Sequence, residues 1–151
     1  MKLKKYRFLL LIITISLIFL DQIIKFQTRL NISLGKEITF IPHILSITYL
    51  QNTGAAWSFM QGNSIFFLLV AFIAILIFIY LLYKYQTDKL ISLGIVLMLT
   101  GTIGNLIDRI KFGFVTDMFK VDFINFPIFN IADMCLTFGV LILIFQLLTE
   151  E

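Results

Sequence analysis

The sequence predicts an integral membrane protein of the all-α class, with four helices that cross the bilayer. Of its 151 residues, 60% are hydrophobic and only 14% are charged, whereas soluble domains have about 45–50% apolar and about 25% charged residues. Four apolar runs approach the length of about 17–25 residues that a membrane-spanning helix needs. Their uniform apolar character favours helices over the alternating strands of a membrane barrel.

The four expected spans cover residues of about 8–24, 65–83, 90–107 and 131–148. No polar stretch between them is long enough to fold alone, so we expect a single domain over residues 1–151. The chain starts with a basic stretch, and no small-x-small cleavage site follows the first run. This argues against a removable signal peptide.

The charge distribution predicts the orientation of the spans. Basic residues divide evenly between the two sides, but those of the N-terminus and of the short 84–89 turn are denser along the chain. Dense basic segments stay in the cytoplasm. We therefore expect both termini there, with segments 26–64 and 108–130 outside.

The two outer segments have different patterns. Glu37–Ile41 and Leu45–Leu50 alternate apolar or aromatic residues with polar ones, which predicts two short strands on the membrane surface. Gly54 is expected to end this region in a turn. The stretch 110–126 is rich in aromatic residues and is expected in the headgroup zone.

Composition also excludes several functions. The net charge of +3 comes from basic residues at the ends of apolar runs, which suits lipid headgroups better than nucleic acid. The chain has one histidine, His43, one cysteine, Cys135, and no HExxH motif, so we expect no metal and no cofactor. Cys135 is expected to be a small buried hydrophobic residue.

Two aspartates at the edge of an apolar run are the main candidates for chemistry. Asp133 starts the fourth run, and Asp117 lies shortly before it. A charged side chain in the bilayer costs about 2.5–3.5 kcal/mol on insertion scales. Two neighbouring carboxylates would share one proton, so that one activates a water and the other polarises a carbonyl, as in aspartic proteases. Alternatively, Asp133 supports a helix start at Asn130 and Asp117 is an exposed loop acid.

The stretch Gly101–Arg109 is a second candidate. On a helix, Gly101, Asn105 and Asp108 share one face, and Arg109 could bind a carboxylate or a substrate carbonyl. Close helix packing through glycine, with an interfacial arginine, is the alternative.

Two shorter motifs complete the set. Asn52, Gly54 and the small residues that follow could bind a substrate backbone, or could form a tight turn beside the interfacial Trp57. Asp21 and Lys25 are four residues apart on one helix face and can pair. That pair either supports a site or is a helix-end ion pair at the headgroups.

Taken in order, these motifs resemble the bacterial lipoprotein signal peptidases, also called signal peptidase II, over the whole chain. The motifs are Asp-Gln-x-x-Lys at 21–25, Asn-x-Gly-Ala-Ala-Trp at 52–57, Gly-x-x-Gly-Asn-x-x-Asp-Arg at 101–109, Val-x-Asp at 115–117 and Phe-Asn-x-Ala-Asp at 129–133. The chain departs from the family pattern at Thr102, Ile103, Met118, Met134 and Cys135, and none of these changes removes a proton-transfer group.

The resemblance implies a fold and an activity. The fold would be four transmembrane helices with a small extracytoplasmic β-cradle and a short interfacial helix. The activity would be that of a membrane aspartic endopeptidase, which removes the signal peptide from diacylglyceryl-modified prolipoproteins by cleaving before the lipidated cysteine. Its catalytic residues would be Asp117 and Asp133. The residues implied to bind substrate or support the site are Asn52, Gly54, Asn105, Arg109, Asn130, Asp21 and Lys25.

The resemblance also implies a place and partners. The protein would be a multi-pass monomer of the bacterial cytoplasmic membrane, with its active site near the outer leaflet. Its partners would be prolipoproteins, membrane lipids and globomycin-type cyclic peptide inhibitors, with no nucleic acid. From the residues alone, a small proton-coupled transporter subunit and a non-catalytic lipoprotein-binding factor remain alternatives.

Overall fold

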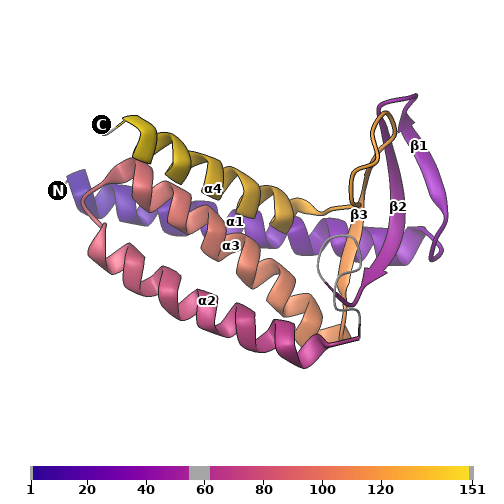
Figure 1. The fold of residues 1–151 in the computed structure, drawn as a ribbon, viewed down its shortest axis with the longest axis horizontal. Helices are drawn as coiled ribbons and strands as arrows, with labels where there is room; N and C mark the ends of the chain where they lie inside the picture. The colour runs from indigo at the N-terminus through magenta and orange to yellow at the C-terminus, as the bar shows by residue number, and fades with distance from the viewer. Residues whose placement is uncertain (1, 55–61, 150–151) are drawn as a thin grey trace.

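A computed structural model describes residues 2–54 and 62–149. In chain order, the elements are α1 (Lys2–Asn31), β1 (Glu37–Ile41), β2 (Leu45–Asn52), α2 (Ser64–Lys84), α3 (Lys89–Phe112), β3 (Val115–Val121) and α4 (Ile131–Thr149). All four helices are long and apolar enough to cross a membrane. The helices form one bundle, and the sheet lies across one of its ends (Figure 1). The predicted membrane fold class is therefore confirmed.

α3 is the central helix of the bundle, and it packs against α1, α2 and α4. Half of its most apolar stretch is buried, compared with 6% for α2. Glycines allow α3 and α4 to approach closely. A Cβ atom on Gly101 would collide with the carbonyl oxygen of Ala132, and one on Gly139 would lie 2.6 Å from Cγ of Met98. The start of α4 is therefore held directly against α3.

The ends of α3 follow from its sequence. Asp88 caps the start, because its side chain accepts a hydrogen bond from the backbone N–H of Ile91 at 2.9 Å. Gly113 ends the helix in the left-handed region, with φ 78°, which a residue without a side chain adopts without strain. The chain turns there and enters β3 two residues later, so β3 starts beside the end of α3.

The sheet is antiparallel, with the strand order β1-β2-β3. The two predicted strands are confirmed, and the second extends two residues further, to Asn52. The third strand, β3, was not predicted, because the aromatic residues of the stretch 110–126 suggested only a headgroup location. It pairs with β2 so that Leu50 lies opposite Asp117 and Asn52 opposite Val115.

Two helices extend beyond the predicted spans. α1 continues past Ile24 to Asn31, and α3 continues through Asp108 to Phe112, a stretch that was expected to lie in the outer segment. Both extensions carry polar side chains that bind one another, so they need no lipid on that face. The described parts of the chain contain no further helix, and the short interfacial helix stays a prediction. The small-residue turn beside Trp57 falls on 55–61, outside the described residues.

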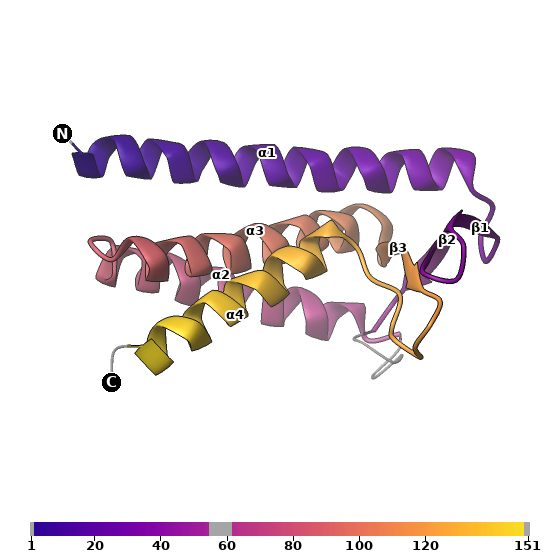
Figure 2. The same cartoon turned by 90° about the horizontal axis from the view of Figure 1, so that it is seen from above.

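α1 begins and α4 ends at the same end of the bundle, opposite the sheet, on different sides of the bundle (Figures 1 and 2). These two helix ends therefore lie on the same side of any membrane that the bundle crosses.

Candidate active site

β3 and the segment before α4 are joined directly, which brings the two candidate aspartates to one place. The N–H groups of Met118 and Phe119 donate to the carbonyl of Phe129 at 3.1 and 2.8 Å, and Phe129 donates back to Phe119 at 3.1 Å. The residue before Met118 is Asp117, and the residue after Phe129 is Asn130. α4 begins one residue later.

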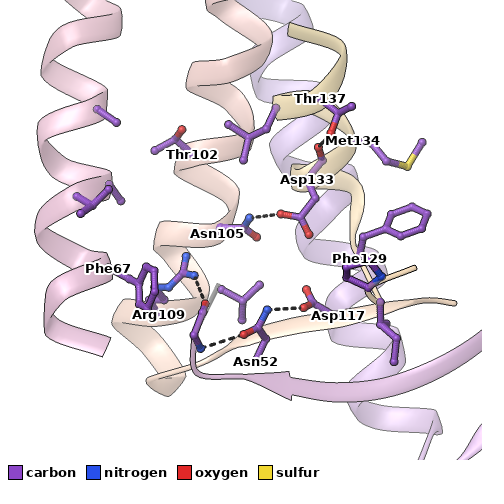
Figure 3. Close-up of a pocket in the computed structure, with 18 of the residues that line it drawn as sticks. Asn52, Phe67, Thr102, Asn105, Arg109, Asp117, Phe129, Asp133, Met134 and Thr137 are labelled. Carbon is purple, nitrogen blue, oxygen red and sulfur yellow. Dashed lines mark hydrogen bonds between the residues drawn. The ribbon is translucent and has the colours of Figure 1, made fainter. Parts of the chain in front are cut away.

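Asp117 is buried, with 1% of its surface exposed. Both of its oxygens accept hydrogen bonds from amide groups. Asn52 Nδ2 donates to Oδ2 at 2.9 Å, and Asn130 Nδ2 donates to Oδ1 at 2.6 Å. Figure 3 shows the Asn52 side chain hydrogen-bonded to this carboxylate at the wall of a pocket. The exposed loop acid that the sequence left open as an alternative is not what the structure has.

Asp133 lies in the first turn of α4. Its Oδ1 accepts from Asn105 Nδ2 at 2.8 Å, and its Oδ2 accepts from the backbone N–H of Asn130 at 3.1 Å. Asp133 N–H donates to Asn130 Oδ1 at 2.9 Å, so the two residues cap the helix reciprocally. The local helix start that the sequence offered as an alternative is therefore present, and it also orients the carboxylate.

Asn130 connects the two acids. Its side chain is fully buried and contacts Asp117 through Nδ2 and the backbone of Asp133 through Oδ1. Both carboxylates line the same cavity of about 700 Å³, which Asn52, Asn105 and Arg109 also line. One buried amide thus holds two acidic side chains at the wall of one cavity.

The environment of Asp117 raises the pKa of its carboxyl from 3.8 to about 7. Burial is the main cause, because it disfavours the charged form, and the negative charge of Asp133 adds to it. The hydrogen bonds from Asn52 and Asn130 act in the opposite direction. Near neutral pH this carboxyl is therefore partly protonated, whereas an exposed aspartate would be ionised.

Arg109 closes the side of the cavity next to α2. Its Nη2 donates to the carbonyl of Gly54 at 3.2 Å, and its guanidinium lies 5.2 Å from the ring centroid of Phe67. Gly54 N–H in turn donates to Asn52 Oδ1 at 2.9 Å, and Asn52 is the partner of Asp117. Arg109 therefore stabilises the turn that orients one of the two acids.

A buried charge cluster lies behind the cavity. Lys25 is completely buried, and its Nζ lies 3.0 Å from Asp21 Oδ2 and 3.7 Å from Asp108 Oδ2. Nζ also donates to Asn105 Oδ1 at 2.9 Å. Because an ammonium group can only donate, Asn105 must turn its oxygen toward Lys25 and its amide N–H toward Asp133.

The two acids of this cluster hold the backbone beside each candidate catalytic residue. Asp21 Oδ1 accepts from the N–H of Ala132 at 3.0 Å, and Ala132 precedes Asp133. Asp108 Oδ2 accepts from the N–H of Thr116 at 2.9 Å, and Thr116 precedes Asp117. The cluster thus fixes the start of α4 and the start of β3 relative to each other.

Comparison with known proteins identifies the family. A family model described as signal peptidase (SPase) II matches residues 13–149. The lipoprotein signal peptidase of Lactiplantibacillus plantarum is 45% identical over 141 residues, which cover 93% of this chain and 95% of that protein. The one from Enterococcus faecalis is 47% identical over 93% of this chain and 88% of that protein. The chain belongs to the signal peptidase II family.

Solved structures agree with this assignment. Two bacterial membrane enzymes determined by the in meso method, at 2.3 and 1.9 Å resolution, are each 34% identical to this signal peptidase II chain. The first has a TM-score of 0.90 over 93% of this chain and 88% of that one, and the second has 0.87 over 94% of each. The predicted family and the prediction of a multi-pass membrane peptidase are confirmed.

All seven residues that were expected to support the site in this signal peptidase lie in or beside it. Asn52, Gly54, Asn105 and Arg109 line the cavity. Asn130, Asp21 and Lys25 lie behind it and contact Asp117, Ala132 and Asn105, respectively. The roles of these residues and of the two aspartates stay predictions.

The sequence reasoning missed three other contributors. Asp108 was noted only for its helix face, although its spacing of three from Asn105 could have indicated a shared cluster. Arg29 binds Thr116 Oγ1 at 2.7 Å and lies 3.6 Å from Asp108, and nothing in the sequence pointed to either Arg29 or Thr116.

No three His, Cys, Asp or Glu side chains in residues 2–54 and 62–149 are grouped to hold a metal ion.

Proposed function

We propose that this signal peptidase is an aspartic endopeptidase that cuts diacylglyceryl-modified prolipoproteins just before the lipidated cysteine. The observation that carries the proposal is that Asp117 and Asp133, bridged by Asn130, line one cavity. The relatives named as lipoprotein signal peptidases support the substrate class. The aspartic mechanism rests on the two carboxylates alone.

In the proposed reaction, the two carboxylates hold one proton between them. The ionised member removes a proton from a water, and the resulting hydroxide attacks the scissile carbonyl. The protonated member donates a hydrogen bond to the carbonyl oxygen, which becomes an oxyanion. The intermediate then collapses, the C–N bond breaks, and a carboxyl proton passes to the leaving amine.

The hydrogen bonds assign different tasks to the surrounding polar residues. The Asn105 oxygen accepts from Lys25 and Asn130, and one of its two amide N–H groups donates to Asp133. Asn105 therefore orients Asp133, and its second N–H faces the cavity side, where a substrate carbonyl would lie. Within residues 2–54 and 62–149, Arg109 donates one hydrogen bond, to Gly54, and we propose that its other donors bind the substrate backbone.

The apolar part of the cavity suits a lipid-linked substrate. Its walls come from α2 and α4 and include Phe67, Val70, Ala74, Leu136 and Phe138. Several of these side chains are exposed at the surface of the bundle, Phe138 by 54% and Val70 by 45%. A substrate helix with acyl tails could enter sideways from the bilayer without contacting water.

We further propose that the protein lies in the bacterial cytoplasmic membrane with both termini in the cytoplasm and the aspartates near the outer leaflet. The termini lie at the end opposite the sheet (Figure 1), and the basic N-terminus favours the cytoplasm. Single cysteines introduced at Lys5 and at Lys120, in a Cys135→Ala background, would test this with a membrane-impermeant thiol reagent. The position in the sheet should react in intact cells, and the position in α1 should not.

The enzymatic test uses purified protein and a diacylglyceryl-modified prolipoprotein. Asp117→Asn and Asp133→Asn should each abolish cleavage while the protein still inserts and keeps its thermal midpoint within a few degrees. Asp122→Asn is the matched control, because Asp122 lies just after β3, outside the cavity, and binds Ser46 at 2.7 Å. A globomycin-type inhibitor should block the wild-type protein.

Normal turnover by either dyad variant would refute the aspartic mechanism. Proton flux into liposomes without any peptide cleavage would instead favour a transporter.

A further inference from the structure

A second cavity lies at the other end of the bundle, away from the aspartates. Its volume is about 440 Å³, within the range of about 300–1,000 Å³ that small-molecule pockets occupy. Its walls are α1 and α2, and α3 forms its floor. The apolar residues that line it include Leu10, Leu11, Ile79, Leu82, Val96 and Leu99.

This groove follows from how the helices pack. α1 and α2 each pack against α3 but make little contact with each other, so a trough stays open between them. At the end of the groove nearest the start of α1, the Tyr6 hydroxyl donates a hydrogen bond to the carbonyl of Lys89 and connects α1 to the start of α3. The hydroxyls of Thr14 and Ser92 donate to the carbonyls of Leu10 and Tyr85. The walls therefore offer mainly apolar surface, and the hydroxyls of Thr14 and Ser92 are already hydrogen-bonded to the backbone.

The mouth of the groove is positively charged. Arg7 lines the cavity and is exposed, and it has no ion pair or hydrogen bond with the described residues. Gln86, also at the mouth, is likewise unpaired within that part of the chain. Lys84 and Lys89 lie at the same end of the bundle. The acid in the connecting turn, Asp88, already caps α3.

We propose that this groove binds an anionic phospholipid, with one acyl chain along the trough and the phosphate on Arg7. Basic pockets between transmembrane helices bind anionic headgroups, and each nearby basic residue contributes about 1 kcal/mol. A signal-peptide helix is the alternative occupant of this groove. Its basic N-terminal region would be repelled by the positive charge at the mouth. The dyad cavity opens on another face of α2, through Phe67 and Ala71, so the two grooves do not compete.

The inference depends neither on the aspartates nor on proteolysis, and it is tested by lipid binding alone. The full-length protein in detergent is titrated with dioleoyl phosphatidylglycerol and with dioleoyl phosphatidylcholine, and bound lipid is counted by native mass spectrometry. The wild-type protein should bind the anionic lipid more tightly. Arg7→Gln should weaken that binding about five-fold, the equivalent of about 1 kcal/mol for one basic residue, and leave phosphatidylcholine binding unchanged.

Two further variants separate a groove from a diffuse charge. Lys5→Gln removes the same charge at the same end of α1, but Lys5 does not line the cavity, so lipid affinity should not change. Leu11→Trp places a larger side chain over the trough at a position that is 55% exposed. It should therefore weaken the binding of both lipids without unfolding the protein. Its thermal midpoint is the check on folding.

Three results would overturn the proposal. One is equal affinity of the wild-type protein for the two lipids. Another is an equal loss of phosphatidylglycerol binding in Lys5→Gln and Arg7→Gln, which would indicate surface charge only. The third is displacement of the lipid by free glycerol 3-phosphate at similar concentrations, which would assign the site to a soluble phosphate rather than to a lipid.

Discussion

Replacing Lys25 by methionine removes the central charge of the buried cluster while keeping a side chain of similar shape. Lys25 is completely buried between Asp21, Asp108 and the oxygen of Asn105. In the wild-type protein, these two acids are balanced by Lys25 and by Arg29, which lies 3.6 Å from Asp108. Lys25→Met leaves one buried negative charge without a partner.

The expected cost is about 3–5 kcal/mol, the range measured when one partner of a buried ion pair is removed. At about 2–4 °C per kcal/mol for a chain of this length, the thermal midpoint should fall by at least 6 °C. Turnover should fall too, because Asn105 would keep only Asn130 to hold its oxygen, at 3.1 Å. The orientation of Asp133 would then be less well defined.

The double variant Asp21→Asn/Lys25→Met tests the electrostatic explanation. It removes one charge of each sign and leaves Asp108 balanced by Arg29, so it should be more stable than the sum of the two single variants predicts. We expect a coupling of about 2 kcal/mol, within the range seen for contacting residues. Thermal unfolding in one detergent provides the measurement for all four proteins. Strictly additive losses, or a fully stable Lys25→Met protein, would refute the reasoning.

Three further predictions concern pH, helix packing and a surface ion pair. The pKa of Asp117 is about 7 in the folded protein, compared with 3.8 for an ordinary aspartate, so between these two pH values the folded state binds more protons than the unfolded state. The free energy of unfolding should therefore fall as the pH rises from about 4 to about 7, and Asp117→Asn should flatten this dependence in thermal midpoints measured against pH. Gly101→Ala would push its new methyl group into the carbonyl of Ala132, so stability should drop by about 1–3 kcal/mol and cleavage with it. Lys120→Gln breaks an exposed pair with Glu37 at 2.7 Å and should leave the thermal midpoint unchanged.

The sequence predicted what local pattern determines. The four long apolar runs could only be helices in a bilayer, and the alternation in 37–41 and 45–50 predicted two strands correctly. β3 was missed because Val115–Val121 has no alternation of its own. It becomes a strand through pairing with β2 and with Phe129, and such distant contacts leave no local signal.

The candidate site was predicted as a set of residues and not as a network. Spacing suggested that Asp21 pairs with Lys25, and the structure has that pair at 3.0 Å. It could not suggest that Asp21 also accepts from Ala132, since the two residues are far apart in the chain. The contacts of Asp108 with Lys25, Arg29 and Thr116 were missed for the same reason. The ends of α1 and α3 were also placed too early, because Lys25 and Arg29 were interpreted as the boundary of the span, whereas both side chains face Asp108 on α3.

The attachment of α2 has a consequence for how the molecule can open. Of its residues, only Ala71 is buried, and its main contacts are with α3. A helix held along one side can swing outward at small energetic cost, since few packed atoms separate when it moves. When α2 moves away from α3, lipid acyl chains can cover the apolar side chains that lose their contacts. An opening on either side of α2 would then widen without disturbing the buried charges behind the aspartates, which α1, α3 and α4 hold among themselves.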